Sequence, residues 1–423
     1  MRLILARHPV TDIRFGDSTH LEGTSLQVDA DELRRLIMTD ERLSSVDLEI
    51  VRPGENCRAG PVFDIIEPRA KDSVSEADFP GILSAPVIAG NGTTHVLEGA
   101  AVTVIDATQT GGPIRSVLEM SGPSAERSIY SSLQHLIVVP HVRPELAMHV
   151  AQNATRRAGL RTAVYLGQAA IGHTPAMTET FDSVGPTETG REGLTRVAYV
   201  GQIYSRQRTP EVDEEIIYGA NTDGMLPVLL HPNEWLDGAV VPSYNSSLGG
   251  AETYFYQNHP VIIDLYRRHQ ARELNFVGTV ATIAGADNAD RDRSCQIAAQ
   301  LIRWNLNADA VVLTKYGGGV PHADMAETAR LLEGMGIRTA VMVSDMSRDR
   351  RVESALLFNF PEVDAIVYCG GNGTTWNVPP VERVIAGNPD MAEALAKSQD
   401  FTASNIVGVV NQQGATRLRA VVY

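Results

Sequence analysis

Cysteine and basic residues are scarce in this chain, and each scarcity excludes a class of protein. The sequence of 423 residues has 3 cysteines, Cys57, Cys295 and Cys369, spaced too widely for a disulfide framework or a zinc-binding pattern. Lys and Arg number 36 against 51 Asp and Glu, which gives a formal net charge of −15. Because a nucleic-acid backbone is bound by a basic surface, we expect no nucleic acid among the partners.

Long apolar runs are also missing. No stretch reaches the roughly 18 apolar residues of a membrane span, so we expect no membrane association. Residues 1–10 contain two Arg and one His and have no apolar segment, unlike a secretory signal peptide, and we therefore expect a cytoplasmic protein. The hydrophobic fraction of 43% is that of a globular protein, and the length allows two or three domains.

The apolar periodicity predicts an α/β fold, with a β-rich N-terminal region followed by two α/β regions with mostly parallel sheets. We expect a β-rich domain at residues 1–125, a first α/β domain at 126–240, a candidate processing loop at 241–260 and a second α/β domain at 261–423. The first of these regions shows short alternating runs, for example at 46–51 and 94–106, and an amphipathic helix at 30–39.

The two α/β regions are expected to alternate strands and helices. In the first, the pattern predicts strands at 134–140 and 161–167 around a helix at 144–158, then a polar surface loop at 176–192 and strands at 197–204 and 228–230. In the second, it predicts strands at 275–283, 310–314, 338–343 and 365–368, with helices at 290–305 and 323–335. These apolar runs are continuous and rich in β-branched residues, as in strands that are covered on both faces.

The candidate processing loop holds the most informative tripeptide, Asn245-Ser246-Ser247. A Ser hydroxyl in a strained Asn-Ser turn can attack the preceding carbonyl, and the resulting ester can eliminate and hydrolyse to a pyruvoyl group. That ketone reacts with amines, which no ordinary side chain does. The alternative is an ordinary turn, because Asn and Ser are common turn residues. His259, shortly after this tripeptide, is a candidate base, with a purely structural histidine as the alternative.

Two glycine-rich loops follow predicted strands and are candidate substrate-binding loops. The first, at residues 316–324, offers Gly318, Gly319, His322 and Asp324, and the second, at 369–376, offers Gly371, Asn372, Thr374 and Thr375. Ligands bind beyond the carboxyl ends of strands in open α/β sheets, where glycines allow close approach of backbone amides to a small anion. Tight βα turns are the alternative for both loops.

Two cysteines deserve separate interpretations. Cys369 ends a predicted strand beside glycines, where a thiol is a candidate nucleophile or redox group, with a buried strand cysteine as the alternative. The Asn56-Cys57 pair has residues suited to the same backbone cleavage, but it lies in a short RPGENCRAGP turn. No histidine spacing indicates a metal site, and the loop at 316–324 lacks the Gly-Lys-Ser/Thr ending of a nucleotide-binding loop.

Phrases along nearly the whole chain resemble those of one family. They include HPNEWLDGAVV and TYFYQNHPVI around the tripeptide, YRRHQARELNFVG at 266–278, the run at 325–345, and VPPVERVIAG at 378–387. The chain resembles the proprotein of glycine, sarcosine or betaine reductase protein B, which gives alpha and beta subunits, and the related D-proline reductase proprotein. In that family a Cys at the cleavage point becomes a pyruvoyl group. Here Ser246 is the best placement of that position and Ser247 is the next, and Ser is a weaker nucleophile than Cys.

The resemblance implies an oxidoreductase-complex subunit whose cofactor is a pyruvoyl group derived from Ser246, with no metal or nucleotide. Such a subunit activates a small amine or amino acid for reductive C–N cleavage by a thiol- or selenocysteine-bearing partner subunit, and the product passes to a small carrier protein. Activity is then expected only with the partner present. Two alternatives stay open: an unprocessed member that binds substrate without covalent chemistry, and a non-catalytic binding or assembly protein that shares only the fold.

Overall fold

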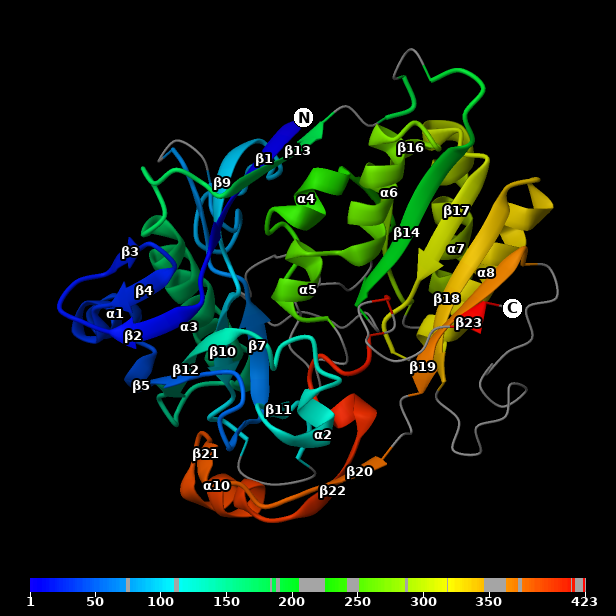
Figure 1. Cartoon of the computed structure of the whole chain (residues 1–423). Coiled ribbons are helices and arrows are strands. Elements are labelled where there is room, and N and C mark those ends of the chain that lie inside the picture. Colours follow the sequence, from blue (N-terminus) through cyan, green and yellow to red (C-terminus); the bar gives the residue numbers. More distant parts are fainter. Residues whose placement is uncertain are drawn as a thin grey trace.

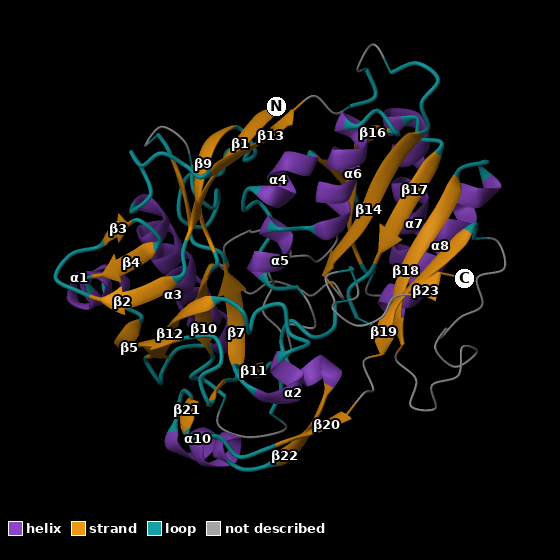
Figure 2. Cartoon of the chain, viewed as in Figure 1, coloured by secondary structure: helices purple, strands orange, loops and turns teal. Residues whose placement is uncertain are grey.

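The computed structural model shows a chain built from several β-sheets with helices packed on their faces (Figure 1 and Figure 2). It describes residues 1–73, 77–109, 114–182, 185–187, 191–204, 225–241, 251–285, 288–317, 319–345, 363–371, 375–411, 413–414 and 421–422. The predicted α/β class is confirmed. No helix within these ranges is long and apolar enough to cross a membrane.

The N-terminal part contains two four-stranded sheets. The first has the order β13-β1-β9-β8 and consists of β13 (Met177–Asp182), β1 (Arg2–Pro9), β9 (Gly92–Glu98) and β8 (Arg69–Lys71). The second has the order β5-β12-β10-β7 and consists of β5 (Leu43–Val51), β12 (Gln134–Val142), β10 (Ala100–Ile105) and β7 (Val62–Ile66). The long helix α3 (Met148–Gln168) contacts strands of both sheets and shares a hydrophobic core with them.

Smaller elements surround these sheets. One three-stranded sheet has β2 (Asp12–Phe15), β4 (Ser25–Val28) and β3 (His20–Glu22), another has β11 (Leu118–Glu119), β6 (Cys57–Ala59) and β21 (Arg383–Ile385), and β20 (Thr375–Val378) pairs with β22 (Gln399–Thr402). The accompanying helices are α1 (Ala30–Ile37), α2 (Gly122–Ala125), α10 (Pro389–Ala396) and the short η2 (Ala403–Asn405).

Two local predictions in this part are wrong. Residues 161–167 form the last turns of α3 and not a strand, because Gly159 and Gly167 let the helix lie directly on the sheets. A Cβ atom at Gly159 would lie 2.3 Å from Val104 Cγ2, and one at Gly167 would lie 2.3 Å from the carbonyl carbon of Arg69. The predicted surface loop at 176–192 contains β13, an antiparallel neighbour of β1 whose partly exposed, polar sequence hides its strand character.

A seven-stranded sheet dominates the second half, in the order β15-β16-β14-β17-β18-β19-β23. Its strands are β15 (Val228–Leu230), β16 (Asn275–Ile283), β14 (Arg196–Tyr204), β17 (Ala310–Thr314), β18 (Arg338–Asp345), β19 (Ala365–Gly371) and β23 (Val421–Val422). The strands from β16 to β19 in this order run parallel, while β15 and β23 pair antiparallel at the two edges.

Helices cover both faces of this sheet, as Figure 1 shows. One face carries α4 (Pro232–Leu236), α5 (Thr253–Gln257) and α6 (Pro260–Gln270), and the other carries α7 (Asn288–Gln300), the π-helical segment η1 (Leu301–Leu306) and α8 (Val320–Gly334). Neighbouring residues of β14 point to opposite faces, so Tyr199 belongs to the aromatic core with Trp235, while Val200 packs in the aliphatic core with Met325.

The strand pairing crosses the predicted domain boundaries. β14 and β15 precede the candidate processing loop, whereas β16 to β19 follow it, and both groups belong to the same sheet. β12, assigned by the sequence to the first α/β region, pairs within an N-terminal sheet. These pairings do not themselves define domains, so the domain limits at residues 125, 240 and 260 remain a prediction from the sequence. The candidate processing loop connects elements that already share one sheet.

Candidate functional site

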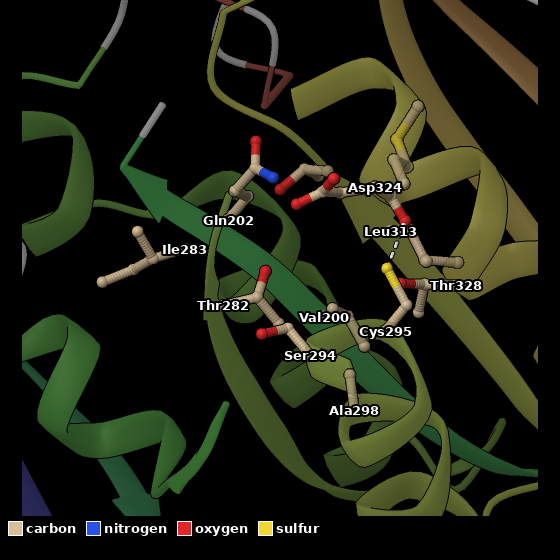
Figure 3. A pocket seen from close by; sticks show the side chains of 12 residues that line it. Val200, Gln202, Thr282, Ile283, Ser294, Cys295, Ala298, Leu313, Asp324 and Thr328 are labelled. Carbon is tan, nitrogen blue, oxygen red and sulfur yellow. Dashed lines mark hydrogen bonds between the residues drawn. The ribbon is translucent and has the colours of Figure 1, made fainter. Parts of the chain in front are cut away.

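The parallel strands of the large sheet end at one edge, and a small pocket lies there (Figure 3). It sits between the ends of β14, β16 and β17 and the first turns of α7 and α8. Its polar lining residues are Gln202, Thr282, Ser294, Thr314, Asp324 and Thr328. Open α/β sheets bind ligands at this edge, because the loops there diverge to opposite faces. We call this region the carboxyl edge.

Asp324, predicted from the sequence as a binding residue, points into this pocket. Its Oδ2 accepts a hydrogen bond of 3.2 Å from the backbone N–H of Gly285. A Cβ atom at Gly285 would lie 2.7 Å from the backbone nitrogen of Arg291, so this close approach requires glycine. The side chain is buried, and its Oδ1 has no hydrogen-bond partner within the described part of the chain. Burial raises the pKa of this carboxyl to about 6.

A buried lysine beside the pocket was missed in the sequence. Lys315 directly follows β17, is completely buried, and donates a hydrogen bond of 2.5 Å from Nζ to the carbonyl oxygen of Gly317. Burial lowers its pKa to about 8. His322, on α8, is also buried, and burial together with the charge of Lys315 lowers its pKa to about 3. The available signal was a single lysine between a buried strand and a glycine run.

The end of β14 is connected to residues from distant parts of the chain. Gln202 Oε1 accepts a hydrogen bond of 3.2 Å from the backbone N–H of Tyr316, in the loop after β17. The backbone carbonyl of Gln202 accepts one of 3.3 Å from Gln413 Nε2. Both Gln202 and Gln413 are buried. The C-terminal segment around Gln413 therefore reaches the carboxyl edge, which local sequence patterns do not reveal.

His259, the predicted base, lies directly before α6 in a buried hydrogen-bonded chain. Its Nε2 is 2.9 Å from the hydroxyl of Tyr199, which in turn is 2.6 Å from the hydroxyl of Thr314 in the pocket wall. Burial lowers the pKa of His259 to about 3, so the ring is neutral. Gly201 leaves space for this chain, because a Cβ atom there would lie 2.6 Å from the Tyr199 hydroxyl.

The cleavage residues Asn245, Ser246 and Ser247 lie outside the described residues, but residues 225–241 before them and 251–260 after them are described. We call these two segments the flanks, and the second of them lies within the predicted limits of the candidate processing loop. Arg69 of β8 contacts both flanks: Nη1 donates to the carbonyl oxygen of Leu236 at 2.7 Å, and Nη2 donates to that of Gln257 at 2.9 Å. The same guanidinium forms a buried ion pair with Glu67. One side chain therefore holds the chain before and after the loop.

Two further contacts fix these flanks to the N-terminal sheets. Before the loop, Asp237 forms a buried ion pair with Lys71 and accepts a hydrogen bond of 2.8 Å from Thr94. In the flank after the tripeptide, the carboxylate of Asp64 accepts hydrogen bonds of 2.9 Å from the backbone N–H and 2.6 Å from the hydroxyl of Thr253. Burial raises the pKa of Asp64 to about 7. We call Arg69, Glu67, Lys71, Asp237 and Asp64 the flank clamp.

The remaining predicted binding residues are distributed along the same sheet. Gly319 begins α8 with a φ of 67°, a conformation that favours glycine, and Gly371 ends β19. Thr375 is exposed at the start of β20, and Gly318, Asn372 and Thr374 lie outside the described residues. The Gly319 and Gly371 loops therefore follow strands of one sheet, with β18 between these strands.

Cys369 is buried in β19, and burial raises its pKa to about 11, so the thiol stays protonated. This environment favours the buried structural cysteine that the sequence left as an alternative. Within the described ranges, no three His, Cys, Asp or Glu residues cluster as a metal-binding group.

Comparisons with known proteins agree along the full length. The family profile of glycine/sarcosine/betaine reductase component B subunits matches residues 1–416. The chain is 31% identical over 437 aligned positions to the glycine reductase complex component B subunits alpha and beta of Acetoanaerobium sticklandii, covering 100% of both chains. It is 30% identical over 436 positions to the protein of the same name from Peptoclostridium acidaminophilum, again covering 100% of both.

A relative with a different name gives the same result. The chain is 30% identical to the sarcosine reductase complex component B subunit alpha of Peptoclostridium acidaminophilum, with 98% of this chain and 94% of the relative covered. No solved structure matches significantly. The full-length profile match and these relatives show that the chain belongs to the family of glycine/sarcosine/betaine reductase component B subunits.

Proposed function

We propose that this chain is the substrate-binding subunit of a reductase complex. It binds a small amine or amino acid at the carboxyl edge and presents its C–N bond for reductive cleavage by a thiol or selenol of a partner subunit. The observation that carries the proposal is the full-length match to component B subunits, whose names refer to glycine and sarcosine reductase complexes. The buried Lys315 and Asp324 support it, because a zwitterionic amino acid needs both a cation and an anion partner.

The proposed cofactor is a pyruvoyl group formed from Ser246 by cleavage after Asn245. This group supplies an electrophilic ketone that reacts with amines. The described flanks are compatible with a chain break at this position. Arg69 binds the carbonyl oxygens of Leu236 on one side and Gln257 on the other, so the described chain on each side of the break would stay bound to one guanidinium. Strands from both pieces also pair within the seven-stranded sheet, which would keep the pieces associated.

The chain's own residues have separable roles in this proposal. Lys315 is assigned to the substrate carboxylate, since this buried lysine directly follows Thr314 of the pocket lining. The chain of hydrogen bonds from His259 through Tyr199 to Thr314 keeps the pocket wall in place, and the neutral ring of His259 leaves that wall uncharged. The flank clamp positions the candidate processing loop relative to the sheet.

A second candidate function is non-covalent binding by an unprocessed chain. Ser stands at both positions 246 and 247, and a Ser hydroxyl is hardly ionised near neutral pH, which favours this alternative over rapid cleavage. The carboxyl edge, with the pocket for one end of the substrate and Lys315 for its carboxylate, would bind the substrate in either case. A partner subunit that carries the thiol or selenol would still be required.

An intact mass measurement on the denatured protein distinguishes the two forms. Two fragments that meet between residues 245 and 246, the second blocked at its N-terminus and reactive with phenylhydrazine, support the pyruvoyl group. Ser246→Ala should abolish cleavage, whereas the matched control Ser247→Ala should not. A single uncut chain with the mass of 45.8 kDa contradicts the electrophile and supports non-covalent binding.

Calorimetry tests the substrate-binding role itself. We expect saturable binding of at least one of glycine, sarcosine, betaine or D-proline, and loss of this binding in Lys315→Met. The control Lys397→Met removes an exposed lysine that pairs with Glu393 on the distant helix α10, and should bind as the wild type does. Absence of binding to all four compounds would contradict the proposed function.

A further inference from the structure

The pocket at the carboxyl edge is far too small for a whole amino acid. Its cavity volume is about 20 Å³. A cavity of roughly 10–15 Å³ on this measure holds one water molecule, so the pocket accepts about one group of that size. An ammonium group is nearly the size of a water molecule.

The lining of the pocket is suited to a hydrogen-bond donor. Figure 3 shows the side chains of Gln202 and Asp324 directed toward each other across it. The hydroxyls of Thr282, Ser294 and Thr314 also line the pocket and can accept hydrogen bonds. The other wall is aliphatic, with Val200, Ile283, Ala298, Leu313 and Met325. An aliphatic wall keeps bulk water away and strengthens the electrostatic interactions inside the pocket.

Asp324 is the feature that selects a cation. Its side chain is 6% exposed, and Oδ1 has no partner in the part of the chain that the structure describes. A carboxylate removed from water is costly unless a donor or a cation meets it. An anionic ligand would be repelled. A divalent metal ion prefers several carboxylates, whereas Asp324 is the single acidic residue among the described residues that line the pocket.

We propose that this pocket binds an ammonium head, either free ammonium or the amino end of a primary amine, with Asp324 as its anion partner. The Gly285 N–H keeps the carboxylate oriented through Oδ2, which leaves Oδ1 for the ligand. The hydroxyls of Thr282, Ser294 and Thr314 then accept the remaining N–H bonds of the ammonium.

This inference rests on the proposed function only for the identity of the molecule that carries the ammonium head, a small amine or amino acid. It also predicts which of these substrates the chain prefers. A trimethylammonium head has no N–H to donate and exceeds the volume of the pocket. Primary amines are therefore favoured over betaine as substrates of this chain. The same pocket can hold the ammonium that is released when the C–N bond of a primary amine is broken.

The binding should depend on pH through Asp324, whose pKa burial raises to about 6. The Gly285 amide and the charge of Arg291 lower this pKa, and Asp292 raises it. The nearby Cys295 thiol is protonated, because burial raises its pKa to about 12. An ammonium ligand needs the ionised carboxylate, so binding should weaken as the pH falls through about 6.

The test measures the melting temperature of the whole protein in ammonium, methylammonium, potassium and tetramethylammonium chlorides at equal ionic strength. Specific binding stabilises the folded state by RT ln(1 + L/Kd), where L is the free ligand concentration, so the melting temperature rises with the logarithm of ligand concentration above Kd. We expect ammonium and methylammonium to raise the melting temperature above the values in potassium and tetramethylammonium. Asp324→Asn keeps an acceptor for Gly285 but removes the charge, and should weaken ammonium binding roughly tenfold or more. Glu327→Gln, on the same helix but paired with Arg330, is the matched control.

Equal effects of ammonium and potassium, or an unchanged response in Asp324→Asn, would overturn the proposal. If Asp324→Asn fails to fold, Thr282→Val provides the second variant, because it removes one lining hydroxyl at nearly constant volume and should also weaken the response. An ammonium response without any amino-acid binding would contradict the proposed function and leave the site standing. Amino-acid binding without an ammonium response would contradict the ammonium site and leave the proposed function standing.

Discussion

Replacing Arg69 by methionine should release both flanks of the candidate processing loop at once. The substitution keeps an unbranched, flexible side chain but removes the guanidinium, and with it the charge and every donor. Glu67, which is 1% exposed, would keep its charge without its buried partner. The carbonyl oxygens of Leu236 and Gln257 would each lose a hydrogen bond. A variant Arg69→Lys keeps the charge, but one ammonium cannot reach acceptors in the forked geometry of a guanidinium.

The expected magnitude follows from these contacts. Removal of one partner from a buried ion pair costs about 3–5 kcal/mol, because the remaining charge stays buried. Each carbonyl left without a donor costs about 1–3 kcal/mol more where water cannot replace it. These costs overlap, so we expect Arg69→Met to lose about 3–5 kcal/mol of local stability. The double variant Arg69→Met/Glu67→Gln should recover a large part, since it also removes the unpaired charge.

Hydrogen exchange measured on peptides from residues 225–241 and 251–260 is the appropriate assay. We expect both peptides to lose protection together in Arg69→Met, partially in Arg69→Lys, and less in the double variant. Peptides from α8 (Val320–Gly334) serve as the internal control, because no contact of Arg69 reaches that helix. Wild-type protection of both flanks in Arg69→Met would refute the clamp.

Three further predictions concern buried groups. Because the pKa of Asp64 is raised to about 7, its protonated form stabilises the fold, and this contribution is lost as the pH rises from about 4 through 7. The free energy of unfolding should therefore fall with pH more steeply in the wild type than in Asp64→Asn, by an amount on the order of 4 kcal/mol across that range, and thermal unfolding at a series of pH values measures it; parallel curves would contradict this. Gly201→Ala should cost roughly 1–3 kcal/mol by displacing Tyr199, whereas Gly334→Ala, whose Cβ meets nothing within 4 Å, should be neutral in the same thermal assay. The 3 cysteines, Cys57, Cys295 and Cys369, are all buried. A thiol reagent should therefore modify none of them in the native protein and all 3 after denaturation; fast labelling of the native protein would contradict this.

The central strands of the large sheet were predictable because their signal is local. Residues 275–283 and 310–314 were predicted with the limits observed for β16 and β17, and 197–204 falls one residue short of β14. Parallel strands covered on both faces are continuous apolar runs, which leave little ambiguity. The strand predicted at 161–167 was wrong, because a short apolar run fits a helix or a strand equally well, and these residues form the end of α3.

The candidate site was only partly predictable, because its geometry depends on contacts between distant residues. His322 and Asp324 were found through the glycine-rich loop after β17, and they lie at the carboxyl edge. Lys315, directly before this loop, was overlooked, since burial and not residue type makes it unusual. Arg69 meets Leu236 and Gln257 across 167 and 188 residues, and no local pattern indicates such contacts.

The position of β16 in the sheet constrains when the proposed cleavage of the chain could occur. β16 follows the candidate processing loop in the chain but lies between β15 and β14, which both precede the loop. During synthesis, β14 and β15 therefore leave the ribosome before β16. Until β16 has also emerged, they lack the strand that pairs with both of them. A chain cut before that moment would release an N-terminal piece with two strands that have nothing to pair with. The topology thus requires folding to come first and any scission second, and the two mature polypeptides would inherit a sheet that neither could assemble alone.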